Sequence, residues 1–189
     1  MSEEETGARG SASLTELEAC AYTDGASTGS RGPGGYGVVI YWKGKAAEIS
    51  GGAQDTTNLR MELTAACVAL ETIDEGYTVT VYSDASYLVN CMRRGWYKNW
   101  NENGWLNHRK KPVANRDLWE RLLEAIDRHH EVRWRKVKGH SKAEGPHKSG
   151  NDRADDLAVT AKQEAASDGG PEPVREARGL AAYGETERQ

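Results

Sequence analysis

The hydrophobic pattern of this 189-residue chain changes its period once, near Leu59, and that change limits the folds available to it. Before this point, apolar and β-branched residues form short runs between turn residues, as in Tyr36–Trp42, which is typical of strands. After it, apolar residues recur at helical spacing from Leu59 to Ile73, and strand-like and helix-like segments then alternate. Short strands followed by this alternation predict a mixed α/β domain with one central sheet.

The individual elements follow from the same patterns. Five strands are predicted, at Ala19–Ala26, Tyr36–Trp42, Ala46–Gln54, Thr78–Ser83 and Glu131–Val137. Four helices are predicted, at Leu59–Ile73, Ala85–Met92, Asn115–His129 and Asp152–Lys162. Gly29–Gly37, with five glycines and a proline, is predicted to be a loop. The first three strands should form an antiparallel meander, and the later strands should run parallel through right-handed crossovers.

Composition divides the chain into one domain and two tails. Residues 1–18 are polar and acidic and predict a disordered N-terminal tail, while residues 165–189 predict a disordered C-terminal tail. Residues 19–164 then form a single domain of ordinary size. No apolar run reaches the length of about 18 residues that a membrane helix needs, and the N-terminus lacks a secretory signal. Three widely separated cysteines favour a reducing compartment, so a cytoplasmic location is expected.

Charge is distributed unevenly along the chain. The formal net charge is −4, yet residues 91–150 hold 15 Lys and Arg against 7 Asp and Glu, a local net charge of +8. A basic half on an acidic protein favours a polyanionic partner. A solvated basic surface without a partner explains the same distribution.

Four acidic residues, Asp24, Glu62, Asp84 and Asp155, lie where strands end or helices begin in this arrangement. Ligands of open α/β sheets gather beyond the carboxyl ends of strands, so the four carboxylates are candidates for one site. Such a site would need a divalent cation, and all-oxygen ligation favours Mg²⁺ or Mn²⁺. Each acid also has an ordinary role, as a turn former, a helix-dipole partner or a surface charge, and spacing alone does not show that the four meet.

His140 follows the fifth predicted strand on a glycine-containing loop. A histidine beside a metal cluster can transfer protons, because its ordinary pKa is near 6.5. A loop histidine without a task is the alternative. Zinc ligation by His140 and His147 is disfavoured, because no cysteine is near and the spacing fits no zinc signature.

Three tryptophans, Trp96, Trp100 and Trp105, lie within ten positions and are flanked by basic residues that include Lys110 and Lys111. Aromatic rings interleaved with cations suit a nucleic-acid backbone. Trp96 and Trp100, spaced i and i+4, equally suit the buried face of a helix. We expect a mixture of core and contact surface.

Six segments carry a resemblance to a known family: Tyr22–Gly25, Gly32–Gly37, Asn58–Leu63, Tyr82–Asp84, Val137–His140 and Asn151–Asp155. In this order, and at close to this spacing, they resemble type 1 ribonuclease H over Ala19–Gln163. The resemblance implies a ribonuclease H-like fold, with a five-stranded mixed sheet and helices on both faces.

The resemblance also implies an activity. The expected enzyme hydrolyses the RNA strand of RNA–DNA hybrids internally and without sequence preference, giving 5′-phosphate and 3′-hydroxyl ends. By position, Asp24, Glu62, Asp84 and Asp155 match the family's metal-binding carboxylates, which hold two Mg²⁺ ions with substrate bound, and His140 matches its loop histidine. Mn²⁺ is a possible substitute. Removal of primers and R-loops by a monomer is the implied cellular role.

Further positions are implied to contact the hybrid: Ser30, Thr57, Asn58, Arg60, Ser86, Trp96, Trp100, Trp105, Lys110, Lys111 and Asn151. Ser30, Leu59 and Ser86 depart from bacterial relatives, which often have Asn, Asn and Gln there. Leucine forms no side-chain hydrogen bond, so Leu59 predicts weaker hybrid binding with the chemistry retained. The loop Ser141–Gly150 is longer than in many relatives.

Two other functions remain alternatives at this stage. A resolvase, an integrase-like nuclease or a reverse-transcriptase fragment can share the fold, but the Val137–His140 loop and the tryptophan segment argue against the first two. No upstream connection or thumb sequence of a polymerase precedes the domain. A non-enzymatic hybrid-binding module is disfavoured, because an inactive site has no use for four mutually repelling carboxylates.

Overall fold

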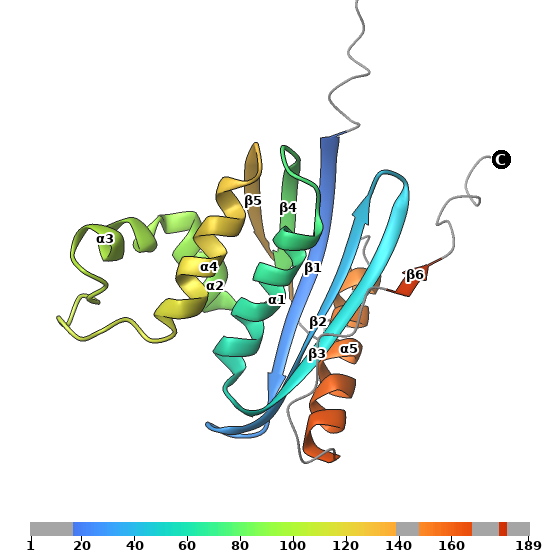
Figure 1. Cartoon of the computed structure of the whole chain (residues 1–189), viewed down its shortest axis with the longest axis horizontal. Coiled ribbons are helices and arrows are strands. Elements are labelled where there is room, and N and C mark those ends of the chain that lie inside the picture. Colours follow the sequence, from blue (N-terminus) through green and yellow to red (C-terminus); the bar gives the residue numbers. More distant parts are fainter. Residues whose placement is uncertain (1–16, 139–147, 168–177, 181–189) are drawn as a thin grey trace, which may run out of the picture.

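The computed structural model describes residues 17–138, 148–167 and 178–180, and one mixed sheet organises them (Figure 1). Its strands are β1 (Glu18–Ser27), β2 (Gly32–Trp42), β3 (Lys45–Thr56), β4 (Thr78–Ser83), β5 (Glu131–Lys136) and β6 (Arg178–Leu180). They lie in the order β5-β4-β1-β2-β3-β6. The pairs β1–β2 and β2–β3 are antiparallel, whereas β1–β4 and β4–β5 are parallel. The five predicted strands, their meander and their parallel pairs are confirmed, and β6 adds a short sixth strand at the β3 edge.

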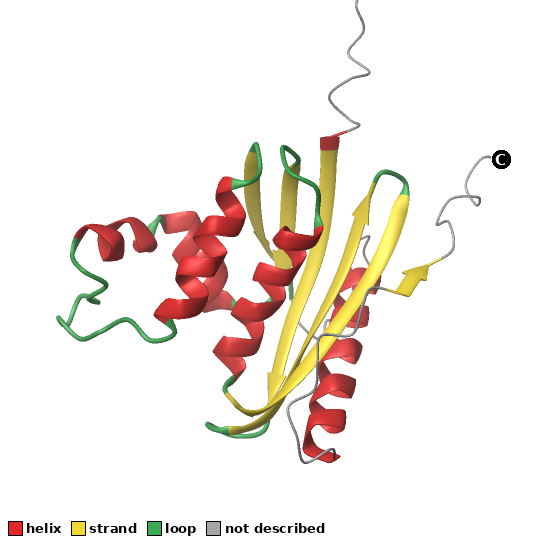
Figure 2. Cartoon of the chain, in the orientation of Figure 1, coloured by secondary structure: helices red, strands yellow, loops and turns green. Residues whose placement is uncertain are grey.

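Helices cover both faces of this sheet, as predicted (Figure 2). They are α1 (Asn58–Thr72), α2 (Ser86–Arg94), α3 (Trp96–Glu102), α4 (Arg116–Asp127) and α5 (Lys148–Ser167). Helix α1 packs on β1 and β2 and also against α4, while α2 lies beside β5. Helix α5 packs on β1, β2 and β3 from the opposite face.

The side chains of β1 alternate between two hydrophobic cores, one on each face of the sheet. Ala19 and Ala21 belong to the large core beneath α1 and α4, while Tyr22 belongs to a small cluster with Val39 and Ala154 beneath α5. Successive strand residues point to opposite faces, so both faces of a central strand must be covered. Burying each large aliphatic side chain of the main core contributes about 1.5–3 kcal/mol.

The glycine-rich segment corrects one prediction. Gly29–Gly37 was predicted to be a loop, but β2 already begins at Gly32. The glycines are needed for packing: a Cβ on Gly35 would lie 2.8 Å from the carbonyl carbon of Ala161, and one on Gly37 would lie 2.8 Å from the backbone nitrogen of Ala158. Real Cβ atoms do not approach backbone so closely. These glycines therefore allow α5 to lie directly on β2.

Several element ends also differ from the predictions. Strand β3 continues through Gly51 and Gly52 to Thr56, and α5 extends from Lys148 to Ser167, past the predicted domain end at residue 164. The short helix α3 was considered only as an alternative for Trp96 and Trp100. Strand β6 and the last residues of α5 fall in the predicted C-terminal tail. Residues 1–16, 168–177 and 181–189, the remainder of both predicted tails, lie outside the described residues.

Two expectations about the environment can be compared with the described residues. None of their helices has the length and hydropathy required to cross a membrane. Cys20, Cys67 and Cys91 are not joined by disulfide bonds. Burial raises the pKa of both Cys67 and Cys91 to about 12, which keeps these thiols protonated and unreactive near neutral pH.

Candidate active site

Three predicted acids meet at one edge of the sheet. Asp24 lies in β1, Asp84 follows the last residue of β4, and Glu62 lies on the first turns of α1. Carboxylate oxygens of these three residues all lie within 4.8 Å of one another. The parallel pairing of β1 with β4, in which Thr23 lies beside Ser83, brings the two aspartates together. Asp24 is followed by three more residues of β1, so it lies within the strand and not at its end.

Close backbone packing fixes the position of Glu62. A Cβ on Gly25 would overlap the backbone nitrogen of Glu62 and would lie 2.7 Å from the carbonyl carbon of Met61. The start of α1 therefore rests directly on β1. Thr57 is the N-cap of α1, and its hydroxyl accepts a hydrogen bond from the Arg60 N–H at 3.3 Å.

Hydrogen bonds hold two of these carboxylates in place. The Gly25 N–H donates to Asp24 Oδ1 at 2.7 Å. The Asn58 side chain donates from Nδ2 to Glu62 Oε1 at 3.3 Å. Each bond uses one oxygen of its carboxylate and holds the side chain in one orientation, which is the preorganisation that a catalytic site needs.

The cluster is electrostatically strained in the absence of a cation. Asp24 and Glu62 are buried, with 7% and 5% of their surfaces exposed. Burial, followed by repulsion from Asp84 and Asp155, raises the pKa of Asp24 to about 7. Burial, followed by repulsion from Asp24 and Asp84, raises the pKa of Glu62 well above its ordinary value. Both effects disfavour the charged carboxylate.

The residues present fit a divalent metal ion. Glu62 Oε2 is buried and has no hydrogen-bond partner among the residues that the structure describes. Leaving a charged oxygen buried and unpartnered is costly, whereas a hard cation would satisfy it and relieve the repulsion among the three acids. Oxygen-only donors suit Mg²⁺ or Mn²⁺.

Asp155 joins the site from the opposite face of the sheet. It lies on α5 and lines the same open cleft, of about 440 Å³, as the other three acids. The remaining lining residues are Gly25, Ala26, Ser27, Asn58, Ala85, Val159 and Lys162. The structure thus brings all four predicted carboxylates to one cleft.

Sequence reasoning missed Val159 and Lys162, which also line this cleft. They follow Asp155 by four and seven residues. Residues at i, i+4 and i+7 share one face of a helix, so this spacing was a usable signal once Asp155 had been singled out.

The predicted histidine lies outside the described residues, since residues 139–147 are not described. The chain that leads to it is described. The Val137 N–H donates to the Ser83 carbonyl at 3.1 Å, which places the exit of β5 beside Asp84.

The predicted hybrid-binding residues outside α3 and its following loop lie on several different elements. Ser86 is exposed at the start of α2, Ser30 is exposed in the turn between β1 and β2, and Asn151 is buried in α5. Arg60 forms a two-bond ion pair with Asp117, whose shortest distance is 2.7 Å, and also donates to Asn115 Oδ1 at 3.3 Å. Arg60 therefore ties α1 to the start of α4.

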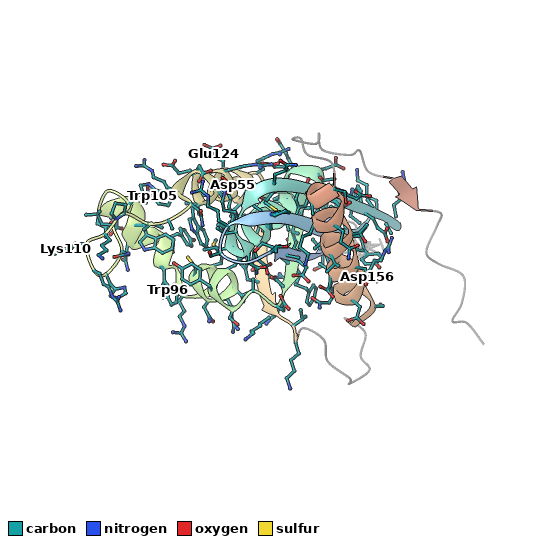
Figure 3. The ribbon with its side chains drawn as sticks, turned by 90° about the horizontal axis from the view of Figure 1, so that it is seen from below. Asp55, Trp96, Trp105, Lys110, Glu124 and Asp156 are labelled. Carbon is teal, nitrogen blue, oxygen red and sulfur yellow. The ribbon has the colours of Figure 1, made fainter. Side chains whose placement is uncertain are left out.

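The predicted tryptophans and lysines lie on α3 and on the loop that follows it, far from α5 (Figure 3). Trp100 and Trp105 are buried in the main core, where Trp100 meets Trp119 edge-on at 5.3 Å between ring centroids. Trp96 is half-buried, and it lines a groove together with Trp100 and Tyr87. Lys110 and Lys111 are exposed. The expected core positions are therefore occupied by Trp100 and Trp105, while a contact surface for nucleic acid stays a prediction.

Fold and site together define an α/β domain with an acidic cation site in an open cleft. The family model described as RNase H matches residues 17–163. A ribonuclease H of Desulforamulus reducens is 50% identical over 143 residues, which cover 76% of this chain and 86% of that protein. A ribonuclease H of Moorella thermoacetica is 49% identical over 144 residues, with 76% and 91% covered. The chain belongs to the ribonuclease H family of enzymes.

Solved structures agree with this assignment. The crystal structure of LC9-RNase H1, a type 1 RNase H with the type 2 active-site motif, has a TM-score of 0.65 and 25% identity over 92% of this chain and 97% of that one. LC11-RNase H1 in complex with an RNA/DNA hybrid has a TM-score of 0.58 and 26% identity, over 79% and 99%. The predicted family and fold are confirmed.

Proposed function

We propose that this enzyme hydrolyses the RNA strand of RNA–DNA hybrids, internally and without sequence preference, giving 5′-phosphate and 3′-hydroxyl ends. The observation that carries the proposal is the group of three carboxylates within 4.8 Å in an open cleft. Family membership and the hybrid bound to LC11-RNase H1 support the choice of substrate.

Asp24, Glu62, Asp84 and Asp155 are the residues proposed to hold the metal, two Mg²⁺ ions with substrate bound or Mn²⁺ in their place. Such ions supply Lewis-acid stabilisation of the charge that develops on the attacking and leaving oxygens. The chain's own contribution is geometric. Gly25 and Asn58 each hold one carboxylate oxygen, and no described residue partners the second oxygen of Glu62.

His140 is proposed to move a proton during the reaction. Support comes from the hydrogen bond between the Val137 N–H and the Ser83 carbonyl, because it starts the histidine-bearing segment next to Asp84. An imidazole with an ordinary pKa near 6.5 exchanges protons readily at neutral pH.

Hybrid binding is proposed to span the cleft rim and the α3 end. The proposed contributors are Ser30, Thr57, Asn58, Arg60, Ser86, Trp96, Trp100, Trp105, Lys110, Lys111 and Asn151. Of these, Trp100, Trp105 and Asn151 are buried, so they would support the contact surface from beneath. Cations at exposed positions neutralise phosphates without reading bases, which suits an enzyme without sequence preference. A monomer that removes primers and R-loops in the cytoplasm completes the proposal.

The test is cleavage of an end-labelled RNA–DNA hybrid with Mg²⁺, Mn²⁺ or EDTA, beside duplex DNA, duplex RNA and single-stranded RNA. We expect metal-dependent cutting of the RNA strand of the hybrid alone, and its loss in Asp84→Asn. Asp156→Asn is the matched control, because Asp156 is exposed on α5 and does not line the cleft. A hybrid that is bound but never cut with either metal would refute the proposal in favour of a binding module.

A further inference from the structure

Lys162 gives the acidic cleft a feature that the carboxylates do not explain. It is the one cation among the described residues that line this cleft, and it shares the cleft with four acids. It nevertheless forms no ion pair with any residue that the structure describes. A lysine in such surroundings keeps its positive charge available for a ligand.

The backbone of Lys162 is held firmly. A Cβ on Gly35 would overlap the backbone nitrogen of Lys162, so this turn of α5 lies directly on β2. Ala158, Ala161 and Ala165 are buried on the face that packs against the sheet. Lys162 is half-buried at the edge of that face. Its stem therefore starts from a fixed point, and less conformational freedom is lost when the ammonium binds.

Helix geometry places Lys162 away from the reacting atoms. Seven residues of α-helix rise about 10 Å, so Lys162 starts about that far from Asp155 along α5. A ligand at Lys162 is therefore a phosphate other than the one at the carboxylates.

We propose that Lys162 binds a backbone phosphate of the nucleic-acid substrate beside the scissile phosphodiester and so positions that strand over the four carboxylates. This inference rests on the proposed function and adds a positioning residue to it. An ammonium group suits this task because it attracts a phosphate as a point charge from several directions. The four acids by themselves would repel the phosphate backbone, and Lys162 opposes that repulsion at the rim.

The test compares Lys162→Met and Lys162→Arg with wild type and with Lys45→Met, an exposed lysine at the start of β3 that lies outside the cleft. For Lys162→Met we expect KM for the hybrid to rise about 3- to 10-fold while kcat changes less than about 2-fold. The slope of log(kcat/KM) against log[salt] should become shallower by about 1, as for the loss of one phosphate contact. Lys162→Arg should restore most of the affinity, and Lys45→Met should match wild type.

A phosphate scan then locates the contact. Hybrids carry a single neutral methylphosphonate at successive positions around one defined cut site. One position should weaken wild type by the same factor as Lys162→Met, and that substrate should not weaken Lys162→Met further. Such non-additivity identifies the two groups as partners.

Each other outcome has a definite meaning. Unchanged KM and salt slope in Lys162→Met, with wild type cutting the hybrid, would refute the role of Lys162 and leave the proposed function intact. A changed Mg²⁺ requirement with unchanged KM would make Lys162 part of the metal site and would also refute it. If wild type cuts no hybrid, hybrid binding by fluorescence anisotropy still compares the variants, and equal affinities would overturn the inference.

Discussion

The acidic cleft and the tryptophan end (α3 with the loop to α4, residues 96–115) solve opposite problems in one domain. In the cleft, Asp24 and Glu62 are buried next to like charge, and no residue in the described part of the chain partners Glu62 Oε2. At the tryptophan end, Trp100 and Trp105 are buried among other aromatic rings, while Lys110 and Lys111 extend into solvent. The buried like charges of the cleft destabilise the fold but suit a cationic ligand. The tryptophan end has an apolar interior that stabilises the fold, and its cations are exposed.

This contrast shows that the residues of the cleft and those of the tryptophan end contribute to stability with opposite sign. Truncation at the tryptophan end should destabilise the fold through lost packing. Neutralising an acid in the cleft should stabilise the metal-free fold, because it removes a charge that burial and repulsion disfavour. Four experiments can sharpen or break the comparison.

The largest effect is expected from Trp100→Ala. Trp100 is 7% exposed and packs against Trp119 and Trp105. Its truncation should lower the free energy of unfolding by about 3–5 kcal/mol. Urea denaturation measures this, with Trp96→Ala as the half-buried comparison, which should lose clearly less. Equal losses in the two variants would show that burial does not divide this end into core and surface.

The next effect is a pH dependence of the cleft. The pKa of Asp24 is about 7 in the folded protein and near 3.8 in the unfolded chain. Between about pH 4 and pH 7 the folded protein therefore binds more protons than the unfolded chain, and stability falls as pH rises. In EDTA, the stability advantage of Asp24→Asn over wild type should grow from pH 4.5 to pH 8, by on the order of a few kcal/mol.

Two results bear on that prediction. Mg²⁺ at pH 8 should reduce the advantage of Asp24→Asn, because only wild type gains a full set of ligands for the ion. An advantage that stays constant with pH in EDTA would mean that Asp24 ionises normally in the folded protein.

Gly25→Ala tests the backbone contact that positions Glu62. The added Cβ would overlap the start of α1 and should separate Glu62 from Asp24. A displacement of about 1 Å in a catalytic group can reduce activity about 100-fold, which is the loss expected in a hybrid cleavage assay. Gly44→Ala is the control: its positive φ of 66° costs about 1 kcal/mol, but nothing lies near its Cβ, so activity should persist. Full activity in Gly25→Ala would show that the cleft tolerates movement of α1.

The smallest effect is expected from Lys110→Ala and Lys111→Ala. Both side chains are exposed, so thermal stability should stay within about 0.5 kcal/mol of wild type. The double variant should bind the hybrid more weakly, with a salt slope shallower by about 1 for each lost phosphate contact. Unchanged binding at low salt would remove this loop from the proposed substrate surface.

The sequence predicted the architecture well because its signals are local. Helical spacing from Leu59 to Ile73 and the strand-like Thr78–Ser83 both correspond to observed elements within one residue. Parallel pairing of β4 with β1 then followed from connection rules. The glycines of β2 were wrongly assigned to a loop. They are needed because the backbone of α5 packs directly on them, and α5 is more than a hundred residues away in the chain.

The candidate site divides in the same way. Asp24, Glu62, Asp84 and Asp155 could be named from the sequence, through strand and helix ends and a family resemblance. Their residue types determined that a hard cation suits them. What the sequence by itself determined is therefore the kind of elements, the family and the donor atoms.

Only the tertiary structure decided how these groups interact. It brings three carboxylates within 4.8 Å, buries Trp105 and places Lys162 in the lining of the acidic cleft. It also leaves Glu62 Oε2 without a partner among the described residues. Burial and charge repulsion depend on distances between residues far apart in the chain, and local propensity contains no information about those distances. The physical reason is that contacts between elements far apart in the chain set these distances, such as the packing of α1 and α5 on opposite faces of β1 and β2 and the pairing of β4 with β1.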